Sequence, residues 1–288
     1  MIALAIAASL FAQAPELPQL PPIRRDPQVT YVDRSGQVIG VRGGRFAPPV
    51  DVARLPGYVP AAFVAIEDRR FYEHEGIDPV GIARALVADV TKGRMAQGAS
   101  TITQQLARDL FLSTDKTVER KATELVYAVQ LERTYSKRQI LGLYLSRANF
   151  GSGAWGLEAA AQRYFGKPAA RLTVREAAIL AGVMKSPTHY DPAIEPEAAL
   201  DRSKLVLAAM LETGAISRAQ YARALAERPH IFTTAPTDGA QYFVDWMDAQ
   251  VRQMVPRVTQ DLVVETTLDL PMEEAAETAA RSSVTGPS

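Results

Sequence analysis

The sequence contains no cysteine, only three histidines and two tryptophans, and no excess of either charge. The lack of cysteine excludes disulfides, thiolate nucleophiles and zinc sites that use cysteine, and it is compatible with an extracytoplasmic enzyme. The 32 basic residues balance the 32 acidic ones, so the overall charge provides no attraction for nucleic acid. An anionic ligand would have to be bound by a local cluster of cations.

A long hydrophobic run is also missing. Residues 1–14 are uncharged and nearly all apolar, but they are fewer than the ~20 residues that a membrane-spanning helix needs. This stretch has three interpretations: a signal peptide without a positive start, a truncated membrane anchor, or a buried terminal helix. The prolines of residues 15–28 favour an extended spacer directly after it, which puts the third interpretation last. The first two both place the rest of the chain outside the cytoplasm.

The length of 288 residues allows one large core or two small ones, at ~100 to 200 residues per domain. Residues 29–50 have β-rich runs on both sides of the sequence DRSG and predict a β-hairpin. Residues 51–230 predict a helical domain. Residues 231–288 predict a linker that contains one strand and one short helix, with no room for a second complete domain.

The helical domain is predicted from its helix starts and its apolar spacing. Ser or Thr followed three residues later by Glu or Gln is a capping-box signature, and it precedes several apolar periodic runs. These signatures begin at Thr101, Ser136, Thr173 and Ser217. One predicted apolar helix face, with the spacing i, i+3, i+4, i+7, consists of Ala122, Leu125, Val126 and Val129.

Two motifs that suggest other functions lack the context they need. Residues 151–156 match GxGxxG, but a helix rather than a strand is predicted before them, so we interpret them as a loop between helices. Residues 113–116 match the Ser-x-x-Lys of penicillin-interacting enzymes, but no Ser-Asp-Asn or Lys-Thr-Gly partner is present. The three histidines show no metal-ligand spacing.

Residues 98–105, GASTITQQ, predict a loop that leads into a helix whose first turn offers hydroxyls, two glutamines and free backbone N–H groups. Such a helix start can bind an anion or sugar oxygens, and an ordinary capped surface helix explains the segment equally well. Farther on, Arg120 and Lys121 share a helix face with Glu124. With Arg108 and Lys116 nearby, these cations suit a diphosphate better than they suit solvated ion pairs.

Five blocks together resemble the peptidoglycan glycosyltransferase domain of class A penicillin-binding proteins and monofunctional transglycosylases, glycosyltransferase family 51. In the family's order they are EDRRFYEHEG, QGASTITQQLARDLFL, RKATELVYAVQLE, SKRQILGLYLSRANFGSGAWGLEAAAQRYFGK and EAAILAGVMKSP. The resemblance covers about residues 60–225. It implies a mainly α, lysozyme-like two-lobed domain that lies against the membrane, with the small β-hairpin before it. Residues 264–269 resemble the segment that leads into a transpeptidase domain, so residues 231–288 are interpreted as a linker towards an absent transpeptidase domain.

The resemblance also implies a substrate and its partners. The substrate is lipid II, a disaccharide-peptide on undecaprenyl diphosphate, and the growing glycan strand, the membrane surface and cell-wall synthesis proteins are the partners. The implied location is the periplasmic face of the cytoplasmic membrane. Glu67 corresponds to the catalytic base for the acceptor's 4-hydroxyl, and Glu124 to a second essential glutamate near the diphosphate. The other positions that match substrate-binding or supporting residues are Asp68, Phe71, His74, Ser100, Thr101, Gln104, Gln105, Arg108, Lys116, Arg120, Lys121 and Lys185.

The implied chemistry agrees with the residue types. A sugar hydroxyl is a weak nucleophile and needs a base, here Glu67 at the end of an apolar segment, while Arg69 and Arg70 anchor the turn or screen neighbouring acids. A diphosphate leaving group needs cations rather than a general acid. A lysozyme-like hydrolase would instead need a protonated carboxyl and an opposing carboxylate, and it remains the first alternative. An inactive scaffold that binds lipid-linked glycan is the second.

No cofactor is required by the sequence. Charge alone would allow a divalent cation, Mg²⁺ or Mn²⁺, to bridge Glu124 and the diphosphate, although no ligand spacing demands one. Ser146 and Asp109 stand where the family usually has asparagine. These departures put in doubt only the hydrogen bonding behind the site and the rate.

Overall fold

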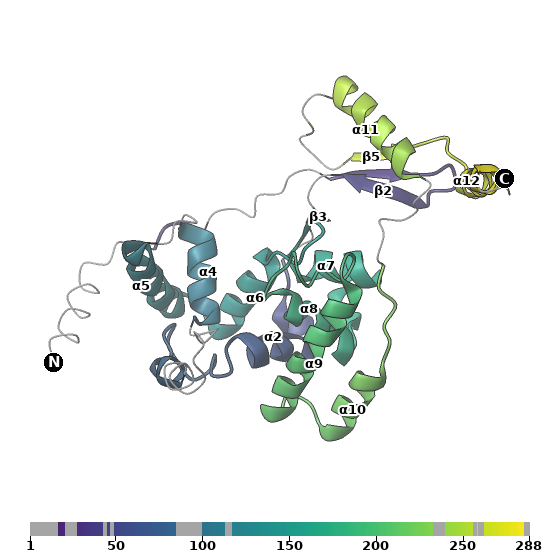
Figure 1. The fold of residues 1–288 in the computed structure, drawn as a ribbon. Helices are drawn as coiled ribbons and strands as arrows, with labels where there is room; N and C mark the ends of the chain where they lie inside the picture. The colour runs from purple at the N-terminus through teal and green to yellow at the C-terminus, as the bar shows by residue number, and fades with distance from the viewer. Residues whose placement is uncertain are drawn as a thin grey trace, which may run out of the picture.

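The structure is a computed structural model, and it describes residues 17–20, 28–42, 45–46, 49–84, 100–112, 117–232, 240–255, 258 and 262–284. Helices dominate it (Figure 1). They are α2 (Tyr58–Glu67), α4 (Ile102–Phe111), α5 (Val118–Thr134), α6 (Lys137–Arg147), α7 (Leu157–Phe165), α8 (Val174–Val183), α9 (Pro196–Glu212), α10 (Arg218–Ala226), α11 (Gln241–Met254) and α12 (Leu270–Val284). The short 3-10 helices are η1 (Val52–Arg54) and η2 (Ala169–Arg171), and the strands are β1 (Val29–Val32), β2 (Val38–Arg42), β3 (Arg45–Phe46), β4 (Ala154–Trp155) and β5 (Leu262–Glu265).

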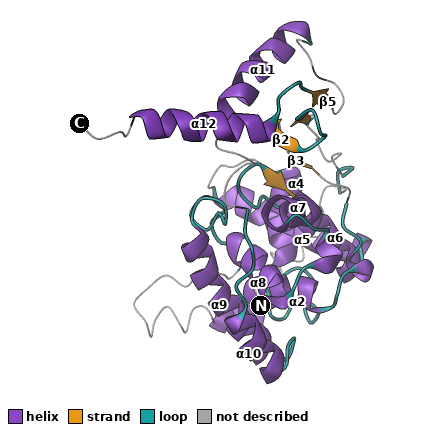
Figure 2. Cartoon of the chain, turned by 90° about the vertical axis from the view of Figure 1, so that its right-hand side faces the viewer, coloured by secondary structure: helices purple, strands orange, loops and turns teal. Residues whose placement is uncertain are grey.

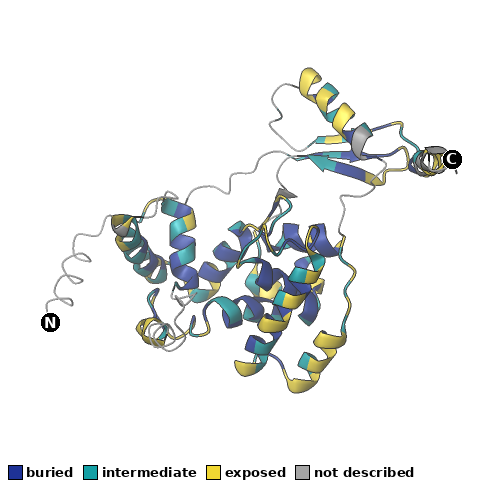
Figure 3. Cartoon of the chain, in the orientation of Figure 1, coloured by how far each residue is buried: buried dark blue, intermediate teal, exposed yellow. Residues whose placement is uncertain are grey.

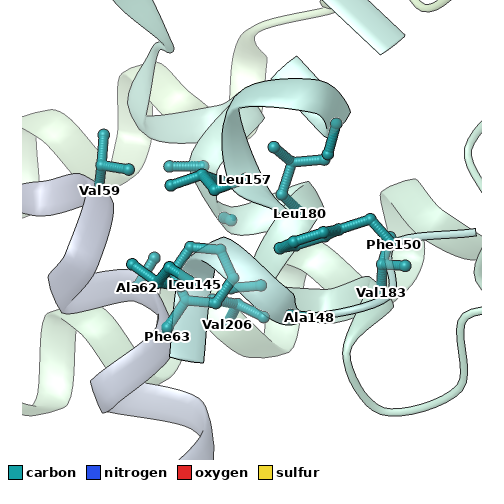
Figure 4. Packing of buried hydrophobic residues seen from close by; sticks show 14 of the residues in the cluster. Val59, Ala62, Phe63, Leu145, Ala148, Phe150, Leu157, Leu180, Val183 and Val206 are labelled. Atoms are coloured by element: carbon teal, nitrogen blue, oxygen red, sulfur yellow. The ribbon is translucent and has the colours of Figure 1, made fainter. Parts of the chain in front are cut away.

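The larger core lies where α2 meets the helices α6 to α9, and Figure 3 shows the buried residues concentrated there. α8 is its central helix, because every residue from Arg175 to Val183 is buried. α2 packs against α8 and α9. Phe63 of α2 meets Phe150 edge to face, with ring centroids 6.0 Å apart (Figure 4). Burying one such aromatic side chain contributes about 1.5–3 kcal/mol, and this packing fixes the helix that ends at Glu67.

α4 and α5 form a smaller lobe beside this core (Figure 1), and α6 packs against both α4 and α7. The predicted mainly helical, two-lobed fold with a small hairpin is therefore confirmed.

The predicted apolar face of α5 is wrong. Its members are exposed or only partly buried: Ala122, Leu125, Val126 and Val129. The buried stripe instead consists of Glu124, Ala128 and Leu131, at the spacing i, i+4, i+7. The inward position of a carboxylate is possible because Glu124 carries its own cationic partners on the same helix.

A small sheet joins both ends of the described chain. β1 pairs with β2 in the predicted antiparallel hairpin and with β5 in parallel, in the order β2-β1-β5. This sheet stands apart from the helical lobes together with α11 and α12 (Figures 1 and 2). Its separate core contains Val29, Tyr31, Ile39, Ala240, Val244, Val251 and Leu270. The sequence prediction treats residues 29–50 and 231–288 as separate segments, whereas the structure joins them because the nearly buried β1 takes the central place in the sheet.

Three of the four predicted capping boxes form. Both hydrogen bonds of the box are present at Ser136, Thr173 and Ser217. At Thr101 only half of the box forms: its hydroxyl accepts from the N–H of Gln104, while the Gln104 amide donates to the carbonyl of a neighbouring loop. Tertiary contact has replaced a local bond at this helix.

The glycines of residues 151–156 serve a tight connection between α6 and α7. At Gly151, φ is +84°, and a Cβ there would lie 2.5 Å from a carboxylate oxygen of Asp191. At Gly156, φ is +87°, and a Cβ would lie 2.7 Å from the carbonyl oxygen of Ser146. Backbone conformation and close packing therefore require these glycines, which agrees with their interpretation as a loop between helices.

Some sequence predictions concern residues outside the described part, namely residues 1–14 and the motif at 113–116, which includes Lys116. Among the residues that the structure describes, no helix is both long enough and apolar enough to cross a bilayer.

The packing of the small sheet can be tested at Gly40 of β2, where a Cβ would lie 2.7 Å from Cγ1 of Val244 in α11. We expect Gly40→Ala to destabilise the protein by about 1–3 kcal/mol, because the methyl group overpacks this contact. In a Val244→Ala background the same change should cost less. Guanidinium unfolding, followed by circular dichroism and tryptophan fluorescence, measures both. Gly57→Ala is the control, since a Cβ there meets no atom within 4 Å; equal penalties in the two backgrounds would contradict the packing.

Candidate active site

Glu67 ends α2 and is partly buried. Its Oε2 accepts a hydrogen bond of 3.0 Å from the Gln105 amide, and Oε1 of Gln105 accepts one of 3.2 Å from the hydroxyl of Tyr144. Burial, together with the nearby carboxylates of Glu67 and Asp109, raises the pKa of Tyr144 well above its ordinary value. The tyrosine therefore stays protonated and donates, and the two hydrogen bonds in series orient the Glu67 carboxylate.

The two arginines after Glu67 bind the following turn to its surroundings. Arg69 forms an ion pair of 2.8 Å with Glu212 at the end of α9. Arg70 lies 2.8 Å from Glu73 and 3.4 Å from Asp78. These pairs support the anchoring role that the sequence suggests for the arginines.

Three motif residues that were grouped with the substrate-binding positions lie inside the protein. Phe71 is fully buried, and Asp68 and His74 are 7% and 6% exposed. The His74 Nε2 lies 3.0 and 3.1 Å from the two carboxylate oxygens of Asp68. Their burial makes them supports of the loop that follows Glu67 rather than surfaces for a ligand.

The same loop is hydrogen-bonded to the start of α4. The Ile102 N–H donates to Asp68 at 3.0 Å, and the Thr101 hydroxyl and the Gln104 amide both donate to the Gly76 carbonyl, at 2.7 and 3.0 Å. Two of the N–H groups expected to be free for an anion at this helix start, those of Ile102 and Gln104, are therefore used by the chain itself. Gly76 has φ of +84°, and a Cβ there would lie 2.9 Å from the backbone of α5, so a side chain at this position would disturb the joint.

Glu124 of α5 is fully buried, and two cations from its own helix neutralise it. The Arg120 Nη1 lies 2.8 Å from Oε2, and the Lys121 ammonium forms a short ion pair with Oε1. Lys121 also donates to the Ser100 hydroxyl at 3.2 Å and to the Gln104 side-chain oxygen at 3.1 Å. A buried charge needs such pairing to be tolerated.

Adjacent glutamines of α4 connect these two groups. Gln105 binds Glu67, and Gln104 binds Lys121, the partner of Glu124. Asp109, one to two turns farther along α4, is close enough to both Tyr144 and Glu124 for their charges to interact. The structure thus brings the candidate base and the cationic cluster to the first turns of one helix.

The remaining predicted residues are less closely tied to this centre. Arg108 is partly exposed on α4, with its Nε 3.5 Å from a carboxylate oxygen of Asp109. Lys185 lies on the exposed segment after α8, and within the described residues no ion pair or hydrogen bond joins its side chain to the others. Lys116 lies outside the described residues. Ser146 is buried and bonds the Val50 N–H and the Gly142 carbonyl, at 2.8 and 2.6 Å.

Sequence reasoning missed three residues whose side chains support this centre: Glu132, Lys137 and Tyr144. Thr103 is one of the hydroxyls expected at the start of α4, but its partner Glu132 was not foreseen. All four lie within the blocks that carry the family resemblance. Their polar side chains beside apolar neighbours gave a signal, but their partners lie on other helices and could not be read from spacing.

The residues do not fit a divalent cation at Glu124. Both of its carboxylate oxygens face positive side chains, which would repel a metal ion. Within the part of the chain that the structure describes, no three His, Asp or Glu residues are grouped closely enough to hold one.

Comparisons with known proteins identify the family of this chain. The sequence model of a family described as transglycosylase matches residues 36–211. Penicillin-binding protein 1A of Aquifex aeolicus is 42% identical over 254 residues, which is 87% of this chain and 35% of that protein. Penicillin-binding protein 1A of Haemophilus influenzae is 44% identical over 224 residues, 77% of this chain and 26% of that protein. The chain therefore spans about a third of the length of these relatives, or less.

A solved structure supports the fold. The crystal structure of penicillin-binding protein 1A from Haemophilus influenzae superposes with a TM-score of 0.52 at 22% sequence identity, and the match covers 89% of this chain and 29% of that one.

The electrostatics of α4 can be tested at Asp109. Partial desolvation raises the pKa of this carboxyl, with a smaller contribution from Glu124, while Arg108 lowers it. A carboxyl whose pKa is raised on folding destabilises the fold above its unfolded pKa of about 3.9, and this effect vanishes at lower pH. We therefore expect Asp109→Asn to raise Tm at neutral pH and to leave it near the parent's at pH ~3.

Calorimetry at both pH values measures the effect of Asp109→Asn. The side chain is 49% exposed, so we expect a small shift. A Tm below the parent's at neutral pH would mean that the ion pair with Arg108 outweighs desolvation.

Proposed function

Because this chain belongs to the transglycosylase family, we propose that it is a peptidoglycan glycosyltransferase that polymerises lipid II into β-1,4 glycan strands. The observation that carries the proposal is the pair of adjacent glutamines on α4, one bonded to Glu67 and the other to the Lys121–Glu124 pair. Two neighbouring residues of one helix turn thus contact the base for the acceptor and a cation for the leaving group. The activity belongs at the outer face of the cytoplasmic membrane, where a lipid-linked sugar is accessible.

The proposed reaction is a displacement at the anomeric carbon of the donor. The 4-hydroxyl of the acceptor sugar attacks this carbon, and its proton passes to the Glu67 carboxylate. The bond between the anomeric carbon and the diphosphate oxygen breaks, and undecaprenyl diphosphate leaves with the electron pair. Gln105 and Tyr144 hold the base in position.

Cations close to the leaving group stabilise its developing charge. Arg108 is the partly exposed cation on α4, whereas Arg120 and Lys121 share their charge with Glu124. Arg120, Lys121 and Arg108 together exceed Glu124 and Asp109 by one positive charge. In this proposal Glu124 aligns the cations and does not exchange a proton.

The hydrolase alternative has less support. It needs a second carboxylate that can activate water opposite the acid, and Glu124 is buried with both oxygens bonded to cations. The scaffold alternative requires a degraded site, whereas both glutamates are present and held in position.

We expect Glu67→Gln to lower polymerisation by about 100-fold or more, because a general base contributes 10²–10⁴-fold. The fold should survive, since a glutamine oxygen can still accept from Gln105. The measurement uses labelled lipid II, with polymer separated from hydrolysed disaccharide. Glu73→Gln is the matched control, because Glu73 lies on the same loop, is exposed and pairs only with Arg70 among the described residues.

Near-normal polymer from the Glu67→Gln variant would refute Glu67 as the base. Free disaccharide in place of polymer from the parent chain would support the hydrolase, and binding without turnover would support the scaffold.

We expect Arg108→Ala to weaken binding of the donor more than binding of the acceptor. A charge-assisted hydrogen bond contributes about 1.5 kcal/mol, so the donor KM should rise roughly tenfold. Single-turnover kinetics with a preformed glycan donor, at varied donor and varied acceptor, measure the two effects separately. Arg133→Ala, an exposed arginine at the far end of α5, is the control; an unchanged donor KM in Arg108→Ala would exclude the diphosphate role.

A further inference from the structure

Lys137, the first residue of α6, lies behind the candidate site and makes three contacts there. Its ammonium donates to the carbonyl of His74 and forms an ion pair of 2.8 Å with Glu132. It also lies 4.5 Å from the centre of the buried Phe71 ring, within the range of a cation–π interaction. His74 and Phe71 belong to the loop that follows Glu67, so Lys137 connects that loop to α6.

The partner of Lys137 extends these contacts to two more helices. Glu132 lies near the end of α5, and its side chain is only 6% exposed. The same carboxylate oxygen that meets Lys137 accepts a hydrogen bond of 2.5 Å from the hydroxyl of Thr103. Thr103 is fully buried in α4, directly before the glutamine that binds Lys121. One ion pair therefore joins the loop, α4, α5 and α6.

This pair differs from the groups assigned to the chemistry. Among the described residues, no hydrogen bond or ion pair connects Lys137 or Glu132 to Glu67, Gln105 or Glu124. A nearly buried carboxylate must be paired to be tolerated, and a lysine can direct its three N–H bonds to a carbonyl and a carboxylate at once. The geometry thus gives this pair a task in holding the helices that carry the site.

We propose that Lys137 and Glu132 are positioning residues that set the place of Glu67 relative to α4 through the loop at residues 68–76. This inference rests on the proposed glycosyltransferase function. Loosening the loop moves the base away from the acceptor hydroxyl, and a displacement of about 1 Å can lower a rate about 100-fold. Donor binding depends on Arg108 and Lys121, which have their own contacts, so it should change much less.

The test compares Lys137→Met with Lys167→Met. Lys167 forms an ion pair of 2.8 Å with Glu176, and the lysine and glutamate side chains are 32% and 4% exposed, against 22% and 6% for the Lys137 pair. Both variants leave a nearly buried glutamate without its lysine, so their effects on stability should be similar. Only the first pair contacts the loop after Glu67.

We expect Lys137→Met to lower kcat about 10- to 100-fold with little change in donor KM, and Lys167→Met to leave both near the parent values. Lys137→Arg should recover part of the lost kcat, because arginine keeps the charge and the donors. Equal losses of kcat in the two methionine variants, or a rise in donor KM that accounts for the whole loss, would overturn the proposal.

Two further measurements keep the test decisive. If Lys137→Met does not fold, the double variant Lys137→Met/Glu132→Gln removes both charges together and leaves no buried charge unpaired, and the same kcat loss is expected from it. Hydrogen exchange at the amides of residues 68–76 should be faster in Lys137→Met than in Lys167→Met. This exchange does not depend on the reaction, so an inactive parent chain would refute the proposed function while the exchange rates still decide the positioning role.

Discussion

The hydrogen bonds between the loop after Glu67 and the first turn of α4 are the joint on which the site depends. The Asp68 carboxylate accepts a hydrogen bond from the Ile102 N–H, and the Gly76 carbonyl accepts hydrogen bonds from the side chains of Thr101 and Gln104. A helix start usually leaves its first N–H groups for solvent or a ligand, but here the Ile102 N–H and two side chains of the first turn join the two lobes. The consequence is that the α2 side and the α4–α5 side meet at a fixed spacing.

The energetics of this joint combine two different environments. The α2 side rests on a large apolar core, in which Phe63 and the central helix α8 are fully buried. The α4–α5 side has a buried stripe interrupted by Glu124, and its stability depends on paired charges. Apolar packing tolerates small displacements better than a buried ion pair does, because an ion pair loses most of its energy when its geometry is lost. The lobe formed by α4 and α5 is therefore the more sensitive of the two to small displacements.

Local signals in the sequence were enough for much of the fold. Capping boxes at Ser136, Thr173 and Ser217 depend on atoms only three residues apart, and the hairpin depends on one turn. The apolar run before Glu67 likewise indicated a buried segment with a carboxylate at its end, and the structure shows this segment as helix α2. Long-range partners were out of reach. The parallel pairing of β1 with β5 and the hydrogen bond from the α4 start to Asp68 each depend on residues distant in the chain.

The parallel pairing of β1 and β5 has a mechanical consequence. The strand before the helical lobes and the strand after them lie side by side, with backbone hydrogen bonds from Leu262 to Gln28 and from Thr266 to Val32. Tension that pulls the preceding chain one way and the following chain the other loads all of these bonds at once, in shear, instead of opening them one by one. The lobes between the strands are then shielded from the pull and can keep their shape under it.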